Sequence, residues 1–176
     1  MEWRTVGLVV RGCLAGMLGV LLLASPCMGG EVQVIAGQAE AINADILKIG
    51  QSRVVLWGID APEPDQVCRA NGKDWGCFDA ALRTLQGLVG RGPVTCFATE
   101  QTDPFKRFYA VCELGGVDIN SEMVKAGMAL AFPQESDAYA SVQLEAIAAG
   151  VGLWQPGVEF QLPWEWREIQ SPGGYK

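Results

Sequence analysis

The amino-acid sequence predicts a mixed α+β domain, with a five-stranded antiparallel β-barrel and three helices. Three features indicate this class. Short apolar strand patterns dominate the chain just after residue 30, an amphipathic helical spacing covers 78–89, and a second strand pair precedes two more helical segments. Strands that follow one another as hairpins, with helices between and after them, favour an antiparallel sheet closed around one core.

Three strands are expected first. They cover residues 31–42, 45–49 and 54–59, and the turn Gly50-Gln51-Ser52 separates the second from the third. The third strand is strongly apolar. Pro62, Pro64 and the polar residues that follow predict an irregular loop as far as Lys73.

The remaining elements are, in order, a helix over 78–89, strands over 94–99 and 108–114, and helices over 118–126 and 136–150. Gly90 is expected to end the first of these helices, while Asp118 and Ser136 are expected to cap the other two. The two strands form a hairpin around Pro104. Symmetry about residue 104 would place Cys96 directly opposite Cys112.

Composition limits the chemistry that the chain can perform. It has 13 Lys and Arg, 20 Asp and Glu, a formal net charge of −7 and no histidine. The lack of imidazole excludes Ser-His-Asp and Cys-His catalysis as well as histidine-ligated zinc. The acidic balance argues against binding nucleic acid mainly through bulk positive charge. Carboxylates, arginines, backbone groups or a metal held by oxygen remain.

Residues 1–30 resemble a secretory signal peptide. Arg4 and Arg11 precede the apolar run Gly12–Ala24, and small residues follow it. The run is shorter than the roughly 20 residues that span a bilayer, so a retained anchor is the weaker alternative and no stable span is expected after cleavage. The sequence therefore predicts an exported protein, periplasmic or secreted.

Four cysteines remain after residue 30, an even number that indicates two disulfides in an exported chain. The hairpin register favours Cys96–Cys112, and the short separation of Cys68 from Cys77 favours the second pair. A zinc site built from all four thiolates is the alternative, but these cysteines lack the close spacings typical of zinc ligands.

The run from Arg53 to Glu63, Arg-Val-Val-Leu-Trp-Gly-Ile-Asp-Ala-Pro-Glu, resembles the third barrel strand of the staphylococcal nuclease-like (thermonuclease) family. Further matching segments follow in the same order: Cys68, 75–77, Cys96, 102–107, Cys112, Asn120, 123–124, 127–129 and 152–154. Together with the predicted signal peptide (1–30), this resemblance divides the chain further into a nuclease-like domain (31–154) and a C-terminal extension (155–176). The extension is expected to be partly packed and then disordered.

The resemblance implies a barrel of the oligonucleotide-binding (OB) type and Ca²⁺-dependent hydrolysis of phosphodiester bonds in DNA and RNA. By position, Asp45, Asp60 and the carbonyl of Ala61 match the calcium ligands, which are the hard oxygen donors that Ca²⁺ requires. Glu63 matches the general base, and Arg107 matches one of two arginines that bind the phosphate. Single-stranded nucleic acid is the implied partner.

The sequence departs from the family pattern at the other arginine, whose place is taken by Val55. Arg53 points to the same side of the strand but lies roughly 6.5 Å further along it. Lys106 adds a positive charge beside Arg107. Because losing one positioned transition-state donor costs on the order of 10²–10³ in rate, catalysis is expected to be impaired or lost.

Two further hypotheses accompany the nuclease. A degenerate domain could bind nucleic acid, a nucleotide or another ligand without cutting it, or the barrel could serve as a protein-interaction module. A positive stripe at Arg53, Lys106 and Arg107 would favour binding of nucleic acid. Val55 packed over the metal position would favour the interaction module. Trp57 could stack on a base, but its place in an apolar strand favours core packing.

Overall fold

The computed structural model describes residues 32–171. The expected signal peptide and residues 172–176 lie outside the described residues. Among residues 32–171, no helix is both long and apolar enough to cross a membrane.

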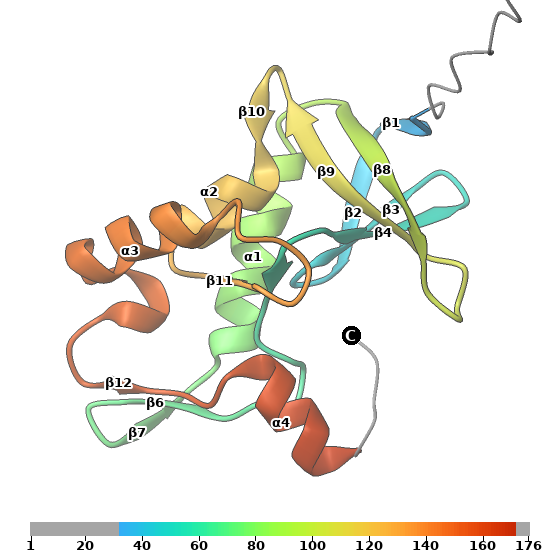
Figure 1. Cartoon of the computed structure of the whole chain (residues 1–176). Helices are drawn as coiled ribbons and strands as arrows, with labels where there is room; N and C mark the ends of the chain where they lie inside the picture. The colour runs from blue at the N-terminus through green and yellow to red at the C-terminus, as the bar shows by residue number, and fades with distance from the viewer. Residues whose placement is uncertain (1–31, 172–176) are drawn as a thin grey trace, which may run out of the picture. The chain divides into compact units, whose positions relative to one another are not determined.

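The main sheet curls around the core, as Figure 1 shows. Its strands follow the order β1-β8-β9-β4-β3-β2, and β10 pairs with β9. Their bounds are β1 Val34–Gly37, β2 Ala39–Asn43, β3 Ile46–Ile49, β4 Ser52–Leu56, β8 Val94–Thr102, β9 Phe108–Leu114 and β10 Val117–Asp118. β1 and β2 lie at opposite ends of this order, yet only Gln38 separates them in the chain. The sheet therefore bends back on itself there, where Gly37 has a φ of 151° that favours glycine.

The predicted combination of strands and helices is confirmed, but the predicted fully antiparallel pairing is wrong at one place. β4 pairs with β9 in parallel, with Val55 opposite Tyr109. The other strand pairs of this sheet are antiparallel. The chain leaves β4 and reaches β9 only after α1 and β8, and such a long crossover is what parallel neighbours need.

Four α-helices occur in the described part of the chain, one more than predicted: α1 Cys77–Val89, α2 Ile119–Lys125, α3 Ala140–Ala149 and α4 Pro163–Gln170. The additional helix, α4, lies in the segment expected to be a partly packed extension. Asp118 caps α2 as predicted, accepting a hydrogen bond from the Ser121 amide at 2.9 Å. Ser136 does not cap α3, which begins four residues later; its hydroxyl oxygen accepts from the Ala138 amide instead.

Both predicted disulfides are present. Cys96 and Cys112 face each other across β8 and β9, as the hairpin symmetry requires. Cys68 and Cys77 are bonded with a Cα–Cα distance of 5.9 Å. This pair of bonds fits an extracytoplasmic location, because disulfides persist in oxidising compartments.

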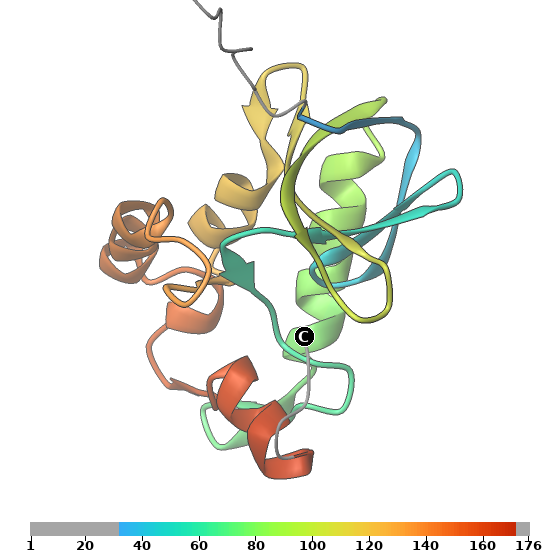
Figure 2. The same ribbon diagram turned by 45° about the vertical axis from the view of Figure 1, so that its right-hand side comes forward.

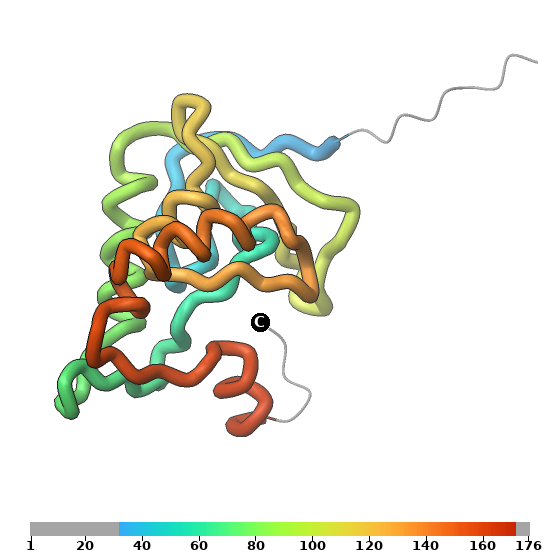
Figure 3. Tube along the Cα trace, turned by 60° about the vertical axis from the view of Figure 1, so that its left-hand side comes forward, coloured from blue at the N-terminus to red at the C-terminus, as the bar shows by residue number. Residues whose placement is uncertain are grey.

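Three short strands form a second small sheet in the order β12-β6-β7: β6 Cys68–Ala70, β7 Lys73–Trp75 and β12 Val158–Glu159. Beside them, a second apolar cluster contains the Cys68–Cys77 disulfide, Leu130, Leu153 and a set of partly buried side chains: Trp75, Trp154, Phe160, Leu162 and Trp164. Figure 3 shows the β6–β7 hairpin and α4 at the end of the molecule opposite to β10. The C-terminal segment is thus a packed part of the domain as far as α4.

Candidate functional site

The predicted acidic residues lie where the chain leaves the main sheet. Val54 and Leu56 of β4 are fully buried in the core, and the chain then turns at Trp57-Gly58. Gly58 has a φ of 78° and donates its amide to Glu135 Oε2 at 2.8 Å. The next strand, β5 Ile59–Asp60, pairs with β11 Leu130–Ala131 and places Asp60 at 0% exposure.

Asn120 holds the end of β4 against β9. Its fully buried side-chain amide donates to the carbonyls of Trp57 at 2.9 Å and Ala110 at 3.1 Å. Its side-chain oxygen accepts from the Cys112 amide at 3.2 Å. Asn120 thereby bonds three backbone groups at the junction of the two strands, and it fixes the segment that leads to Asp60.

Glu63 lies in a turn that is bonded to the C-terminal segment. Its amide donates to Gln66 Oε1 at 3.1 Å, and the Gln66 amide donates to the Glu63 carbonyl at 3.0 Å. The buried side chain of Gln66 also donates from Nε2 to the carbonyl of Gln161 at 2.6 Å. The turn that positions Glu63 therefore also fixes the entry to α4.

Arg167 of α4 bonds to both carboxylates. Its Nη1 donates to Asp60 Oδ1 at 3.0 Å and to Glu63 Oε1 at 2.5 Å, while its Nη2 donates to Asp60 Oδ2 at 2.8 Å. Only 12% of the Arg167 side chain is exposed. Burial opposes its charge, but the hydrogen bonds and charges of Asp60 and Glu63 outweigh burial and raise the pKa of Arg167 above its usual range.

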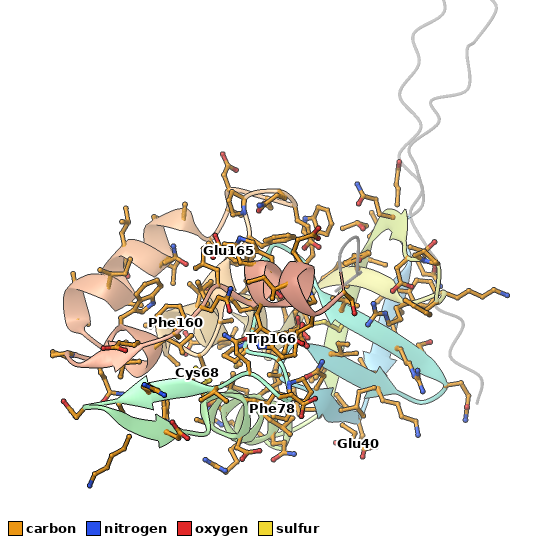
Figure 4. The ribbon with its side chains drawn as sticks, turned by 90° about the horizontal axis from the view of Figure 1, so that it is seen from below. Glu40, Cys68, Phe78, Phe160, Glu165 and Trp166 are labelled. Carbon is orange, nitrogen blue, oxygen red and sulfur yellow. A yellow bond between two sulfur atoms is a disulfide. The ribbon has the colours of Figure 1, made fainter. Side chains whose placement is uncertain are left out.

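The packing of α4 explains how Arg167 reaches this site. Pro163 is buried at the start of the helix, and the Trp164 ring lies 5.3 Å from that of Phe132. Figures 1 and 2 both place α4, in red, beneath the segment that follows β5. Figure 4, seen from below, shows Glu165 and Trp166 on this helix. Sequence reasoning expected this segment to pack but missed the role of Arg167.

The other predicted site residues lie around Tyr109 of β9. Asp45 is buried just before β3, and its carbonyl accepts from the Leu56 amide at 2.9 Å. Arg107 donates from Nε to Asp103 Oδ2. Burial and the carboxylates of Glu135, Asp103 and Asp45 raise the pKa of Tyr109, whereas Arg107 lowers it. Asp45 and Arg107 therefore both lie near enough to Tyr109 for their charges to shift its pKa.

The position of the missing arginine, Val55, and its nearest replacement, Arg53, differ in environment. Val55 is fully buried between Ile46 and Tyr109 in neighbouring strands, and it lies outside both apolar clusters. Arg53 is exposed at the other end of β4, where it lies opposite Lys48 in the register of β3 and β4. It lines a groove of about 350 Å³ with Gln51, Ser52, Phe105, Lys106 and Phe108. Arg53 thus belongs to this groove and not to the acidic site.

Trp57 is half-buried, with its ring edge-on to Tyr109 at 5.6 Å.

Asp60, one of the predicted calcium ligands, is already bound by a cation of the chain itself. Ca²⁺ takes 6–8 oxygen ligands, several of them carboxylate oxygens. Both oxygens of Asp60 already accept from Arg167. The cation that the carboxylates bind here is the guanidinium of α4.

The fold and site of residues 32–171 define a mixed α+β domain with a curled sheet, four α-helices, and the buried Asp60 beside the half-buried Glu63. A family model described as "Staphylococcal nuclease homologue" matches residues 53–156. The chain belongs to this family, whose members typically use Ca²⁺. The match ends before α4, so Arg167 lies outside the part of the chain that the family model covers.

Two curated proteins are similar to the chain. A succinoglycan biosynthesis protein, ExoI, from Rhizobium meliloti (strain 1021) is 30% identical over 155 residues, covering 86% of this chain and 76% of ExoI. An uncharacterized endonuclease from Haemophilus influenzae is 36% identical over 121 residues, covering 68% of this chain and 62% of that protein.

Proposed function

We propose that this protein is an exported, attenuated nuclease that hydrolyses phosphodiester bonds in single-stranded nucleic acid. The observation that carries the proposal is the meeting of Asp60 and Glu63 with a guanidinium in a nuclease-family domain. The relative named as an endonuclease supports the same reaction class. We also infer an OB-type barrel, because β1 and β2 link the two ends of the main sheet.

In the proposed reaction, Glu63 is the general base that takes a proton from the attacking water. Its carboxylate accepts from Arg167 at 2.5 Å, so Glu63 acts as the base while it is bonded to this cation. Arg107, held by Asp103 near the end of the hairpin, is the phosphate-binding arginine of the family pattern. The bond of the base to a cation and the loss of the strand arginine at Val55 both predict slow turnover.

The groove beside Arg53 supports binding of a single strand. It combines the positive charges of Arg53 and Lys106 with the ring of Phe105, which is 68% exposed. The guanidinium of Arg107 lies 5.4 Å from the centre of the same ring. An exposed ring beside cations is the arrangement on which unpaired bases stack while phosphates are neutralised. The groove gives an acidic chain a local positive surface.

Calcium at Asp45, Asp60 and the Ala61 carbonyl remains part of the family expectation, but no step of the proposal depends on it. The reason is chemical: Arg167 occupies the carboxylate oxygens of Asp60 that such an ion would use.

The test is cleavage of a single-stranded oligodeoxynucleotide by residues 31–176, in Ca²⁺ and in EDTA. We expect slow cleavage that Glu63→Gln lowers by at least tenfold, because the substitution removes the base and keeps its shape. Glu159→Gln, an exposed change on β12, is the matched control and should cut at the unchanged rate. Equal cleavage by wild type and Glu63→Gln would contradict the proposal.

A second candidate function is binding of nucleic acid without cleavage. The bond between Glu63 and Arg167 favours it, because a base held by a cation is a weaker proton acceptor. Saturable binding of the oligonucleotide, with no cleavage in either buffer, would establish this alternative.

A further inference from the structure

We infer that Arg167 is the resident cation of the acidic site and that its remaining guanidinium edge receives the phosphodiester, in place of the arginine that the third strand lacks. This inference rests on the proposed function, because it assigns the phosphate-binding group of the same site. It adds a substrate-contacting residue that lies beyond the segment matched by the family model.

A guanidinium carries five N–H groups in a planar fork. Asp60 and Glu63 accept three of them, two from Nη1 and one from Nη2. The Nε–H and the second Nη2–H remain. These two groups lie along one edge of the guanidinium, and such an edge binds two oxygens of a phosphate bidentately.

The guanidinium of Arg167 is held firmly in place. Asp60 is fully buried, and its two oxygens bind Nη1 and Nη2 side by side. Trp164 packs against Phe132, and Gln66 binds the carbonyl of Gln161, so the segment that leads to Arg167 is anchored at two places. A donor fixed before the substrate arrives needs little reorganisation, which is what transition-state stabilisation requires.

The other residues that could bind a phosphate at this site are less well placed than Arg167. Val55 offers no donor, and Arg53 belongs to the groove at the other end of β4. Arg107 matches the other arginine of the family pattern, and its Nε is bonded to Asp103. Arg167, by contrast, donates hydrogen bonds directly to both Asp60 and Glu63. A phosphodiester on its remaining edge would bind the same cation as Glu63, the proposed base, from the opposite side of the guanidinium.

The experiment follows Arg167 itself. The Nε–Hε resonances of ¹⁵N-labelled wild-type protein are recorded by NMR during titration with the dinucleotide d(TpT), and Arg167→Lys assigns the Arg167 peak. We expect the Arg167 peak to shift saturably with d(TpT) and the Arg69 peak, from an exposed arginine on β6, to stay in place. In parallel, oligonucleotide cleavage by Arg167→Lys should fall on the order of 10²-fold, while Arg69→Lys should leave it unchanged.

Arg167→Lys keeps the positive charge that the two carboxylates need, and thermal melting checks that it folds. An Arg167 peak that d(TpT) does not move overturns the inference whatever the rate of the variant. Faster cleavage by Arg167→Lys also overturns it, because α4 would then block the site. A shifted peak in a protein that cleaves nothing supports the inference and contradicts the proposed hydrolysis. A protein that neither cleaves nor shows the shift contradicts both.

Discussion

Arg167 and Asp60 form a bidentate ion pair between residues 107 positions apart in the chain, with N···O distances of 3.0 and 2.8 Å. The Asp60 side chain is 0% exposed and the Arg167 side chain 12%. The pair joins α4 to the strand that carries the candidate site. The charge balance of the site therefore depends on a helix outside the matched family segment.

Removing Arg167 should destabilise the fold. Arg167→Ala leaves Asp60 buried without its cation, and breaking a buried ion pair costs about 3–5 kcal/mol. Arg167→Lys should cost less, because it keeps the charge and loses the bidentate geometry. Urea denaturation followed by circular dichroism measures the free energy of unfolding of each variant.

Arg69→Ala is the matched control for this prediction. Arg69 forms an ion pair with Asp74 at 3.6 Å, but both side chains are more than half exposed. An exposed pair contributes about 0–1 kcal/mol, so the control should unfold close to the wild-type urea concentration. If Arg167→Ala were as stable as Arg69→Ala, the pair with Asp60 would carry no net stability.

Calcium should bind the wild-type protein poorly and the Arg167→Gln variant better. The substitution frees the Asp60 oxygens and leaves negative charge that a hard cation can neutralise. A ligand at 100 times its Kd stabilises the native state by about 2.7 kcal/mol, which a thermal melt resolves. We expect millimolar Ca²⁺ to raise the Tm of Arg167→Gln and leave that of the wild type unchanged.

Asp45→Asn on the Arg167→Gln background is the control, since it should remove the rise in Tm. A clear rise in the wild type that Asp45→Asn abolishes would show that the ion binds beside Arg167. The guanidinium would then not act as a substitute for calcium at Asp60.

The parts of the fold that local pattern determines could be predicted. The register of Cys96 and Cys112 follows from strand alternation on both sides of Pro104, and the disulfide confirms it. Asp60 and Glu63 could be predicted as site residues because they lie in one short run at the end of an apolar strand. In each case the interacting residues are close in sequence, so spacing alone restricts their geometry.

The parallel β4–β9 pair and the Arg167–Asp60 contact could not be predicted in this way. Both depend on how distant segments pack, and strand or helix periodicity says nothing about that. One local feature did point to α4. Pro163 suits the first turn of a helix, and Trp164 and Arg167, three positions apart, then share a face. A buried tryptophan would carry the arginine inward with it.

Tyr139 should make the protein lose stability in strong alkali. Its hydroxyl donates to Asp118 Oδ2 at 3.1 Å. Burial, together with the charge and hydrogen bond of Asp118, raises the pKa of Tyr139 above the ordinary value of 10.0. The unfolded chain then loses this proton first as the pH rises. The free energy of unfolding should therefore fall above pH 10, by up to about 1.4 kcal/mol per pH unit, until the folded state also ionises.

Tyr139→Phe isolates this effect, because both proteins keep Tyr109 and every lysine. The variant lacks one hydrogen bond and should be about 1 kcal/mol less stable at neutral pH. Urea titrations between pH 8 and pH 11 should show the two stabilities converging as the pH rises. Stabilities that stay a constant distance apart over this range would contradict the raised pKa.

The groove beside Arg53 should bind single-stranded DNA through Phe105 and Lys106. Phe105→Ala removes the exposed ring, and the loss of one stacked base costs about 1–3 kcal/mol, or roughly 5- to 150-fold in Kd. Lys106→Gln removes one phosphate contact, which should reduce the slope of log K against log salt by about 0.7. Fluorescence anisotropy of a labelled dT12 oligonucleotide, measured in EDTA at several salt concentrations, gives both quantities.

Lys125→Gln is the matched control, because Lys125 is exposed on α2 and pairs with Glu122 at 3.5 Å away from the groove. It changes the net charge as much as Lys106→Gln does. If the two lysine variants lowered the salt slope equally, long-range charge and not the groove would account for binding. If Phe105→Ala kept the wild-type Kd while Lys106→Gln weakened it, the strand would contact the groove through phosphates alone. A positive groove that uses both residues predicts that each variant weakens binding in its own way, Phe105→Ala at every salt concentration and Lys106→Gln most at low salt.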